Sequence, residues 1–441
     1  MEQFDIALIS SYHQDILSVD WVLTIGEVGK RGTVITPNPN EYEMLMAQGA
    51  HAIYLKHYFP PSVPPLEEIE AYFKARGVND LKDYVATEKS YYFQSDAHLI
   101  AYAYQYAFAF ERIFAEIKIN AILHPVQGGE VVRRTAALIA DLRSVSVIFL
   151  GETFIPGTMN LYSDEFRTVL KPTFHPELSA EKATEVINDK ISRKPVVHYS
   201  TQRRRFKGTP LLKKMYTLVK DGNWNILRAY IARKKSLSID YVIKAGYTKL
   251  TGVFKPLDTT EKYFYYPFNV DAESELFIRN PGFVDQVAAM EKLAKVLPKG
   301  YKLYVKTHPG VDGHLSIRSY RRLRKIKNVV PLKPTINSFD VVKHSQGVVM
   351  ASSTVGLESY IMGKATCVVG LWPYTTYGNF VTVNDLSETF DRILTRKTTN
   401  DPVKFVQNLY RDTIAGSIYG SADDFKLLIN NLFEYTHLKN R

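Results

Sequence analysis

The sequence predicts an α/β protein with two Rossmann-like domains in tandem, and three observations support this fold class. Short apolar runs alternate with segments whose apolar residues recur at helical spacing, which is typical of parallel β/α units. The composition, 45% hydrophobic and 23% charged, is that of a soluble globular chain and excludes disordered, collagen-like and coiled-coil proteins. The length of 441 residues suits two or three domains at roughly 100–200 residues each.

The first domain is predicted over residues 1–200. Its expected strands and helices occupy, in order, residues 4–9 (strand), 97–118 (helix), 120–124 (strand), 130–143 (helix) and 145–150 (strand). The second helix starts directly after Gln127, Gly128 and Gly129. Because ligands of such folds bind at the carboxyl ends of the strands, we expect these three residues to line the ligand cleft.

The second domain is predicted over residues 256–400, and the remaining tail, 401–441, is expected to be mostly helical and to pack back on the first domain. The expected elements are strands 263–266, 302–306, 347–350 and 365–369, a helix over 281–297, and a helix that starts after residues 351–354. Two domains of this kind are expected to face each other across a ligand-binding cleft.

Residues 201–255 are predicted to form a helical linker, and its part 203–235 is strongly basic. It holds eleven Lys and Arg against one acidic residue, Asp221, so it carries almost the whole net charge of +11. Two interpretations stay open. Arg203–Lys235 is either an amphipathic helix pair that contacts an anionic membrane surface or a lipid-linked acceptor, or a solvated face that covers the interdomain junction. The concentration of charge argues against nucleic acid as a partner.

One cysteine, Cys367, excludes an intrachain disulfide and a multi-cysteine metal site, and fits a reducing compartment such as the cytoplasm. The first residues lack the basic start and apolar run of a signal peptide. The most apolar stretch, 97–114, contains His98, Glu111 and Arg112, so no membrane-spanning helix is expected. We expect a protein that is soluble or peripheral to a membrane.

A histidine and a lysine follow the strand expected at 302–306. The residues are Lys306, Thr307, His308, Pro309 and Gly310. A histidine at a strand end, near a lysine and backbone amides, is well arranged to bind a phosphate, and Pro309 favours an extended backbone at His308. An ordinary His–Pro turn explains the same residues equally well.

Small hydroxyl residues follow the strand expected at 347–350. Ser352, Ser353 and Thr354 lie where a buried strand passes into a helix, and free N–H groups, the helix dipole and hydroxyls converge there on an anion. Glu358, one turn further, can accept hydrogen bonds from a ribose. Plain capping of the helix is the alternative, and it is compatible with phosphate binding.

Carboxylates follow two further strands. Asp271 and Glu273 come after strand 263–266, and Glu152 comes after strand 145–150. Such groups serve as nucleophile or as acid and base, although solvated loop acids are an equally good explanation. The sequence has no phosphate loop, no GxGxxG after the first strand, no HExxH and no Asp-x-Asp. We therefore expect neither a metal nor a cofactor.

Taken in this order, the four stretches resemble the bacterial capsule polysaccharide biosynthesis family. That family includes retaining β-Kdo transferases and related CMP-ulosonic acid transferases of GT-B architecture. Residues 306–309 are similar to its His-Pro motif, and residues 352–358 with Gly363, Lys364 and Gly370 to its serine motif. The resemblance implies that both motifs bind the phosphate and ribose of CMP without a metal.

The other two stretches match the family with departures. Residues 266–273 are similar to its Pro-Leu-(His/Gln)-x-x-x-(Glu/Asp) segment, with Phe268 and Asn269 in place of the usual residues and Glu273 at the acidic position. Residues 149–158 resemble the first-domain motif, with Gly151 and Glu152 shifted from the usual Glu-Asn-Gly.

The resemblance implies a glycosyltransferase that moves an ulosonic acid, Kdo or a nine-carbon relative such as pseudaminic acid, from its CMP donor to a glycan or lipid-linked glycan acceptor. With retention, Glu273 or Asp271 attacks the sugar, Glu152 is the acceptor's base, and His308 stabilises the departing CMP. Two other interpretations stay open: a CDP-glycerol-type glycerophosphotransferase, and a non-catalytic protein that binds nucleic acid or membrane through the basic segment.

Overall fold

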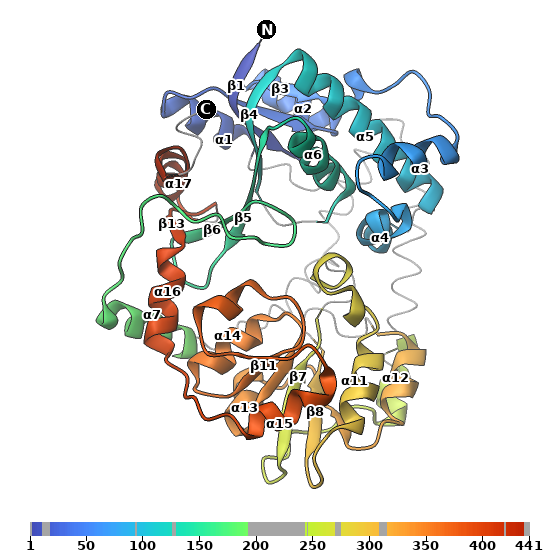
Figure 1. Ribbon diagram of the computed structural model, residues 1–441, viewed down its shortest axis with the longest axis vertical. Coiled ribbons are helices and arrows are strands. Elements are labelled where there is room, and N and C mark those ends of the chain that lie inside the picture. Colours follow the sequence, from blue (N-terminus) through green and yellow to red (C-terminus); the bar gives the residue numbers. More distant parts are fainter. Residues whose placement is uncertain are drawn as a thin grey trace. The chain divides into compact units, whose positions relative to one another are not determined.

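The computed structural model describes residues 2–10, 18–92, 95–125, 129–192, 243–244, 246–269, 275–307, 315–418 and 420–435. They form two compact units (Figure 1). The first unit comprises Met1–Val186, Ala272–Pro281 and Val403–Arg441, and the second comprises Ile187–Asp271 and Gly282–Pro402. In the described part of the chain, no helix has both the length and the apolar character needed to cross a membrane.

The first unit is built on a seven-stranded sheet in the order β13-β6-β5-β4-β1-β2-β3. Five strands are parallel: β1 (Gln3–Ile9), β2 (Gly32–Thr36), β3 (Ala52–Tyr54), β4 (Lys118–His124) and β5 (Ser146–Glu152). At one edge, β6 (Thr158–Tyr162) runs antiparallel to both β5 and β13 (Thr413–Ala415). The parallel strands follow the Rossmann order 3-2-1-4-5.

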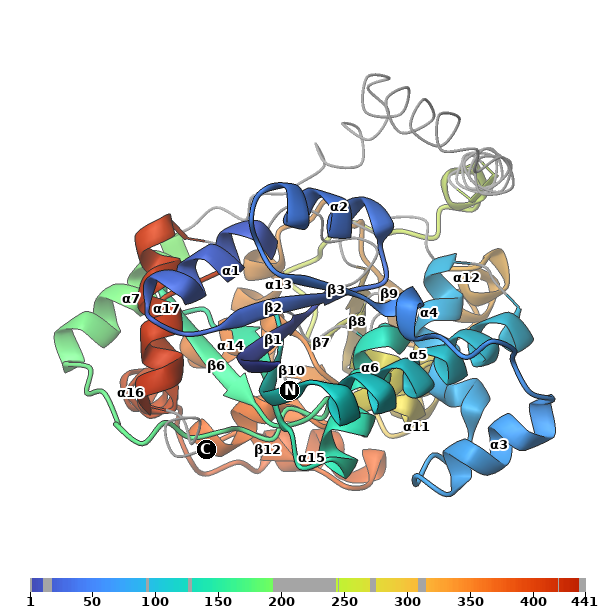
Figure 2. The same cartoon turned by 90° about the horizontal axis from the view of Figure 1, so that it is seen from above.

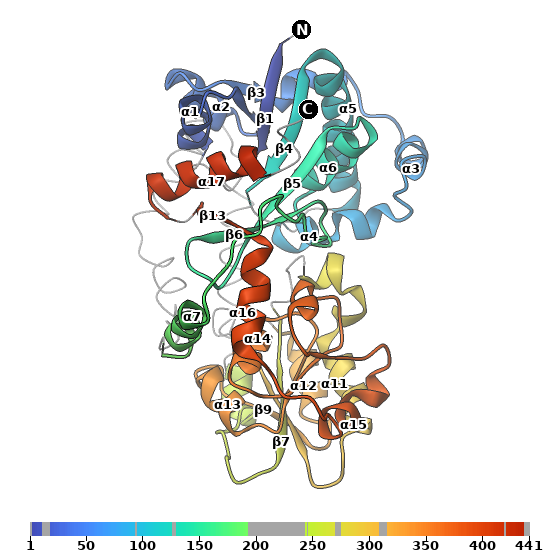
Figure 3. The same ribbon diagram turned by 60° about the vertical axis from the view of Figure 1, so that its left-hand side comes forward.

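Helices cover both faces of this sheet. On one face α5 (Asp96–Glu116) and α6 (Val131–Leu142) lie side by side (Figure 2). On the other lie α1 (Ser18–Glu27) and α17 (Ala422–Tyr435) (Figure 3). Side chains of β1 alternate between the two cores, Ala7 and Ile9 facing the α5 side and Ile6 and Leu8 the α17 side, as the period of two demands.

The remaining helices of the first unit lie in the connections between its strands and in the tail. They are α2 (Pro39–Ala47), the 3₁₀ turn η1 (Leu55–Tyr58), α3 (Leu66–Lys74), α4 (Leu81–Tyr92) and α16 (Pro402–Arg411), and α7 (Ala180–Ser192) continues from this unit into the second. The ring of Trp21 on α1 lies 4.6 Å from that of Phe425 on α17. The C-terminal helix therefore packs back on the first unit, as predicted.

The second unit has six parallel strands in the order β12-β11-β10-β7-β8-β9. They are β7 (Tyr263–Pro267), β8 (Lys302–Lys306), β9 (Val329–Pro331), β10 (Val348–Met350), β11 (Thr366–Val368) and β12 (Val381–Thr382). Counted from β7, this is the Rossmann order 3-2-1-4-5-6, which reverses between β7 and β10. The predicted fold class, two Rossmann-like units in tandem, is confirmed.

Around this sheet lie α11 (Gln286–Lys295), α12 (Ile317–Leu323), α13 (Ser338–His344), α14 (Thr354–Ile361) and α15 (Thr389–Leu394). The helix predicted over 281–297 starts later than expected. Pro281–Phe283 forms a separate 3₁₀ turn, and Asp285 caps the helix by accepting a hydrogen bond from the Ala288 N–H. The tail also contains a strand, β13, that was not predicted. The basic segment 203–235 lies outside the described residues.

Candidate functional site

Three polar segments of the second unit lie at one edge of its sheet. Strands β10, β7 and β8 are consecutive and parallel, so their carboxyl ends share an edge. Ser352 follows β10, Asn269 follows β7 and Thr307 follows β8. This is also the point where the strand order reverses, the place at which open α/β sheets bind ligands.

Asn269 holds two of these segments together. Its backbone N–H donates to Oε1 of Gln286 at 2.8 Å, and Nε2 of Gln286 donates to its carbonyl at 3.0 Å. Gln286 is buried at the start of α11. The Nδ2 of Asn269 donates to the carbonyl of Ser352. The residue that departs from the family motif therefore fixes the serine turn relative to the end of β7.

The serine turn caps helix α14. The Oγ of Ser353 accepts a hydrogen bond from the Val355 N–H at 3.3 Å, and Ser352 is buried. A Cβ added at Gly356 would meet the side chain of Met350 and lie 3.2 Å from the ring of Trp372, so a glycine allows α14 to approach β10 this closely. The predicted capping is present, and the Gly356 N–H also donates to the Ser353 carbonyl, at 3.0 Å, so an anion at this helix start would meet the Thr354 N–H first.

Near the serine turn, Glu358 on α14 interacts with two lysines, Lys190 and Lys306. Lys306, at the end of β8, is 3% exposed, and its Nζ donates only weakly to the Pro334 carbonyl, at 3.5 Å. Burial lowers its pKa to about 8, against the attraction of Glu358. Burial raises the pKa of Glu358, while Lys190, with Nζ 3.6 Å from Oε1, and Lys306 both lower it. Lys306 is therefore a buried lysine whose Nζ makes one long hydrogen bond among the described residues.

Two buried oxygens at this edge lack hydrogen-bond partners among the described residues. They are Oδ1 of Asn269 and Oγ1 of Thr307, which follow the neighbouring strands β7 and β8. A buried polar atom without a partner costs about 1–3 kcal/mol. Such atoms are uncommon in folded proteins and are expected where a ligand or water completes the hydrogen bonding.

In the first unit, Gly129 follows β4, and Glu152 is the last residue of the adjacent strand β5. A Cβ at Gly129 would lie 2.8 Å from Cγ2 of Thr87 and 2.9 Å from Cδ1 of Ile278, so the backbone passes too close to its neighbours for any larger residue. The side chain of Glu152 is exposed at the carboxyl end of β5. The structure places both residues at the edge where the sequence predicted them.

A carboxyl that the sequence did not indicate lies beside Gly129. Glu88 on α4 accepts a hydrogen bond from the Val131 N–H, the first of α6, at 2.6 Å. Burial raises the pKa of Glu88 to about 7, the Val131 N–H opposes this shift, and Glu130 adds to it. Because Glu88 and Val131 are 43 residues apart, no local pattern could have revealed the contact.

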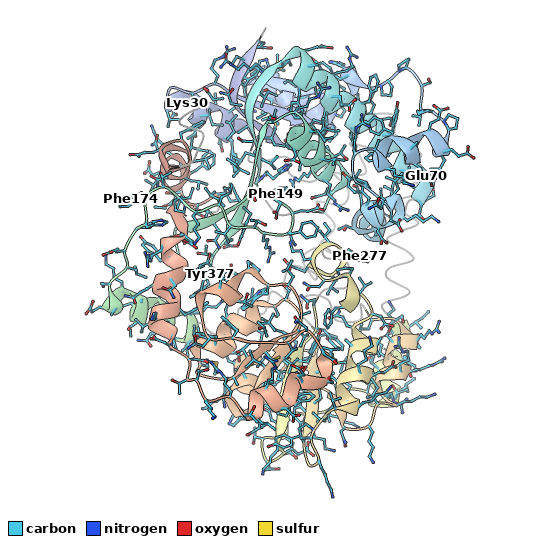
Figure 4. The ribbon with its side chains drawn as sticks, in the orientation of Figure 1. Lys30, Glu70, Phe149, Phe174, Phe277 and Tyr377 are labelled. Carbon is cyan, nitrogen blue, oxygen red and sulfur yellow. The ribbon has the colours of Figure 1, made fainter. Side chains whose placement is uncertain are left out.

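His124, the last residue of β4, is a packing residue. Its side chain is fully buried, and its ring stacks on that of Phe149 with centroids 4.3 Å apart. Phe149 is labelled in Figure 4. Burial and the neighbouring Arg133 hold its pKa well below the ordinary value. Both ring nitrogens are buried and have no hydrogen-bond partner among the described residues, and the lowered pKa disfavours the charged form of the ring.

Ion pairs fix residues 275–280 in the first unit. Glu275 pairs with Arg167 and, at 3.1 Å, with Arg279. The Nε of Arg279 donates to the Glu165 carbonyl at 2.7 Å, and Arg134 pairs with the Glu165 carboxylate at 2.8 Å. The preceding described residue, Asn269, is held in the second unit, so the chain passes from one unit to the other across residues 270–274.

Several predicted residues lie outside the described part of the chain. They are Gln127, Gly128, Asp271, Glu273, His308 and Pro309. Their roles stay predictions. Among the residues that the structure describes, no group of three or more His, Cys, Asp and Glu side chains is placed to hold a metal ion.

Part of the sequence matches the model of a known protein family. Residues 230–419 match the family model described as capsule polysaccharide biosynthesis protein. No curated protein matches the sequence. Among solved structures, the chain is similar to Thermosulfurimonas dismutans KpsC, described as a beta Kdo 2,7 transferase, with 15% identity over 74% of this chain and 94% of that one and a TM-score of 0.33.

A second match is the KpsC structure described as a beta Kdo 2,4 transferase, with 14% identity over 73% of this chain and 93% of that one and a TM-score of 0.30. A third is the UDP-GlcNAc 2-epimerase of Methanocaldococcus jannaschii in complex with UDP-GlcNAc and UDP. It is 9% identical over 97% of this chain and 99% of that one, with a TM-score of 0.36. Because the sequence identities and TM-scores are this low, these likenesses say nothing about the substrate.

Proposed function

We propose that this chain, a capsule polysaccharide biosynthesis protein over residues 230–419, is a glycosyltransferase that moves an ulosonic acid from a CMP donor to a glycan acceptor with retention of configuration. The observation that carries the proposal is the edge formed by β10, β7 and β8. There, a helix start, the buried Lys306 and two buried oxygens without hydrogen-bond partners among the described residues lie at the ends of consecutive strands.

The second unit would hold the donor. Lys306, His308, Pro309 and the turn 352–354 would bind the single phosphate of CMP, and Glu358 its ribose. A lysine whose pKa is about 8 is mostly protonated at neutral pH and supplies a positive charge inside the protein. One phosphate needs less charge compensation than two, and the lysine and the helix start provide it without a metal.

The reaction would then proceed by two displacements. Glu273 or Asp271 attacks the anomeric carbon, and the bond to the CMP phosphate breaks with its electron pair going to the phosphate oxygen. The acceptor hydroxyl displaces the enzyme carboxylate in turn and gives its proton to Glu152. Two inversions restore the original configuration.

We assign the basic segment 203–235 to contact with the inner face of the cytoplasmic membrane, where a lipid-linked acceptor would lie. Co-sedimentation with anionic liposomes tests this assignment. Neutral replacements at Arg203–Arg205 and Lys213–Lys214 should abolish binding, and unchanged sedimentation would contradict the assignment.

Donor turnover tests the proposed reaction. The full chain is incubated with CMP-Kdo, CMP-nonulosonates or CDP-glycerol, each with a glycan acceptor, and released nucleotide is measured. We expect CMP from an ulosonic acid donor and loss of its release in His308→Ala. Full activity of His308→Ala, or turnover of CDP-glycerol alone, would contradict the proposal.

A further inference from the structure

The first unit contains a hollow that the proposed reaction does not use. Its volume is about 390 Å³, and it lies between η1 with the loop that follows it and the first half of α5. Its polar and aromatic lining consists of Lys56 and Phe59 from the first wall and His98, Tyr102 and Gln105 from α5.

The hollow lies toward the carboxyl edge of the sheet. Strand β3 ends at Tyr54, and η1 follows at once. Helix α5 ends at Glu116, just before β4 starts at Lys118, so its last turn lies at the amino edge. Its 21 residues span about 31 Å, whereas the seven residues of β4 span about 23 Å. The first turns of α5 therefore reach the edge that also carries Gly129 and Glu152.

Two aromatic rings in the hollow are partly exposed and held firmly. Tyr102 stacks on Tyr106 with ring centroids 5.9 Å apart, and Phe59 meets the same ring edge-on at 5.7 Å. The ring of His98 lies edge-on to Tyr102 at 4.6 Å. Fixed aromatic faces suit the C–H face of a sugar ring, and the amide of Gln105 can both donate to and accept from sugar hydroxyls.

The charge of the hollow favours an anion. Lys56 is exposed, and among the residues that the structure describes no Asp or Glu lines the hollow. Among sugars, those that carry a carboxylate fit this lining best. Lys56 would pair with the carboxylate of such a sugar, and the rings of Phe59 and Tyr102 would contact its C–H face.

The wall formed by the loop is stiff. Residues 60–65 include four prolines around Val63, which lines the hollow and is 39% exposed. Proline fixes its own φ angle, so this loop has little conformational freedom to lose. A preformed wall reduces the entropy that a flexible glycan must overcome on binding.

We propose that this hollow binds an acidic sugar of the acceptor glycan, at a distance from the reacting hydroxyl. The inference rests on the proposed function, because it assumes an acceptor that reaches the carboxyl edge of the first unit. Strand β3 is three positions from β4 in the sheet, which is about 14 Å along that edge. One sugar cannot occupy both places, so the ligand class is an acidic oligosaccharide.

Binding of a defined probe tests the inference. A tetramer of α2,8-linked sialic acid is titrated into the full chain by calorimetry, with maltotetraose as the neutral comparison. We expect the acidic tetramer to bind more tightly and to lose affinity as salt is raised. Lys56→Gln should weaken its binding about fivefold, and Gln105→Glu should weaken it by at least as much because the new carboxylate repels the ligand.

Lys74→Gln is the matched control, because Lys74 is exposed at the end of α3 and does not line the hollow. Its affinity for the tetramer should equal that of the unmodified chain. The inference would be overturned if Lys56→Gln and Gln105→Glu bound the acidic tetramer as tightly as the unmodified chain does. It would also be overturned if the unmodified chain bound maltotetraose as tightly as the acidic tetramer.

Release of CMP from the donor without acceptor is measured on the same proteins. Unchanged CMP release together with weakened tetramer binding in both variants supports the inference. Absence of CMP release with every ulosonic acid donor, the unmodified chain included, refutes the proposed function instead. The affinity comparison then still decides whether the hollow recognises acidic sugars.

Discussion

At the carboxyl edge of the second unit's sheet, residues that follow neighbouring strands hold one another, as Asn269 holds Ser352. At the same edge of the first unit, the contacts come from helices and from a segment that returns late in the chain. Glu88 reaches α6 from α4, and Ile278 packs on Gly129. The comparison shows that loops after neighbouring strands hold the second edge, whereas side chains on helices and on segment 275–280 hold the first.

Removing the buried cation should have the largest effect on the second edge. Lys306→Met keeps the packing but removes the charge that would face the donor phosphate, so kcat/KM for CMP release should fall about 10²–10³-fold. Steady-state kinetics with saturating acceptor measure it.

Lys302→Met, at the opposite end of the same strand β8, is the control and should keep its activity. If Lys306→Met retains the full rate, the donor phosphate does not bind at this edge.

Gly129→Ala should destabilise the first unit. The new Cβ would overlap Thr87 and Ile278, and such overpacking costs about 1–3 kcal/mol. Urea unfolding followed by circular dichroism measures the loss. Gly282→Ala, where a Cβ would meet no atom within 4 Å, should unfold at the same urea concentration as the unmodified chain. Equal stability of both variants would contradict the close approach at Gly129.

Removing the hydrogen bond between Asn269, after β7, and the serine turn should have a smaller effect on activity. Asn269→Asp keeps the size of the side chain but loses the N–H that Ser352 accepts. A hydrogen bond of this kind is worth about 1 kcal/mol, so the KM for the donor should rise about fivefold while the folded state persists. An unchanged KM would show that the turn holds its shape without Asn269.

Replacing Glu88 should have the smallest effect, which is a change in how the stability of the first unit depends on pH. Burial raises the pKa of Glu88 from its ordinary value to about 7, so the folded state binds this proton more tightly than the unfolded state does. Stability should therefore fall as the pH rises from about 5 to 8. Glu88→Gln keeps the acceptor for the Val131 N–H but cannot ionise.

Thermal unfolding across this range measures the difference between the two proteins. The midpoint of Glu88→Gln should exceed that of the unmodified chain increasingly toward pH 8. Parallel curves for both proteins would mean that Glu88 is not buried in its charged form.

The sequence predicted β1, β4, β5, β7, β8, β10 and β11 because each is a short, buried apolar run, and β8 matches its expected bounds, Lys302–Lys306. It missed β2, β3, β9 and β12. It also placed the serine turn, since a hydroxyl residue before a helix has a local physical reason. Pro281 suggested a helix start, but the true cap is Asp285, four residues later. Short strands such as β3 carry too few residues to show a period.

The missed parts of the site depend on contacts between distant residues. Glu88 lies in an ordinary helix, and only its approach to Val131 gives it a role. Arg167 and Glu275 are 108 residues apart, and no pattern in either neighbourhood reveals that they meet. Lys190 likewise reaches Glu358 from α7. Such contacts follow from the completed fold rather than from local preference.

The tail has a consequence for synthesis on the ribosome. Strand β13 adds to the edge of the first unit's sheet, and α17 buries Trp21 and the adjoining core. The first unit is therefore incomplete until its last segment is made, although most of its residues are made first. The second unit, whose sheet is contiguous in sequence from β7 to β12, can fold earlier. While it does so, the apolar face that α17 later covers is open to chaperones and to aggregation.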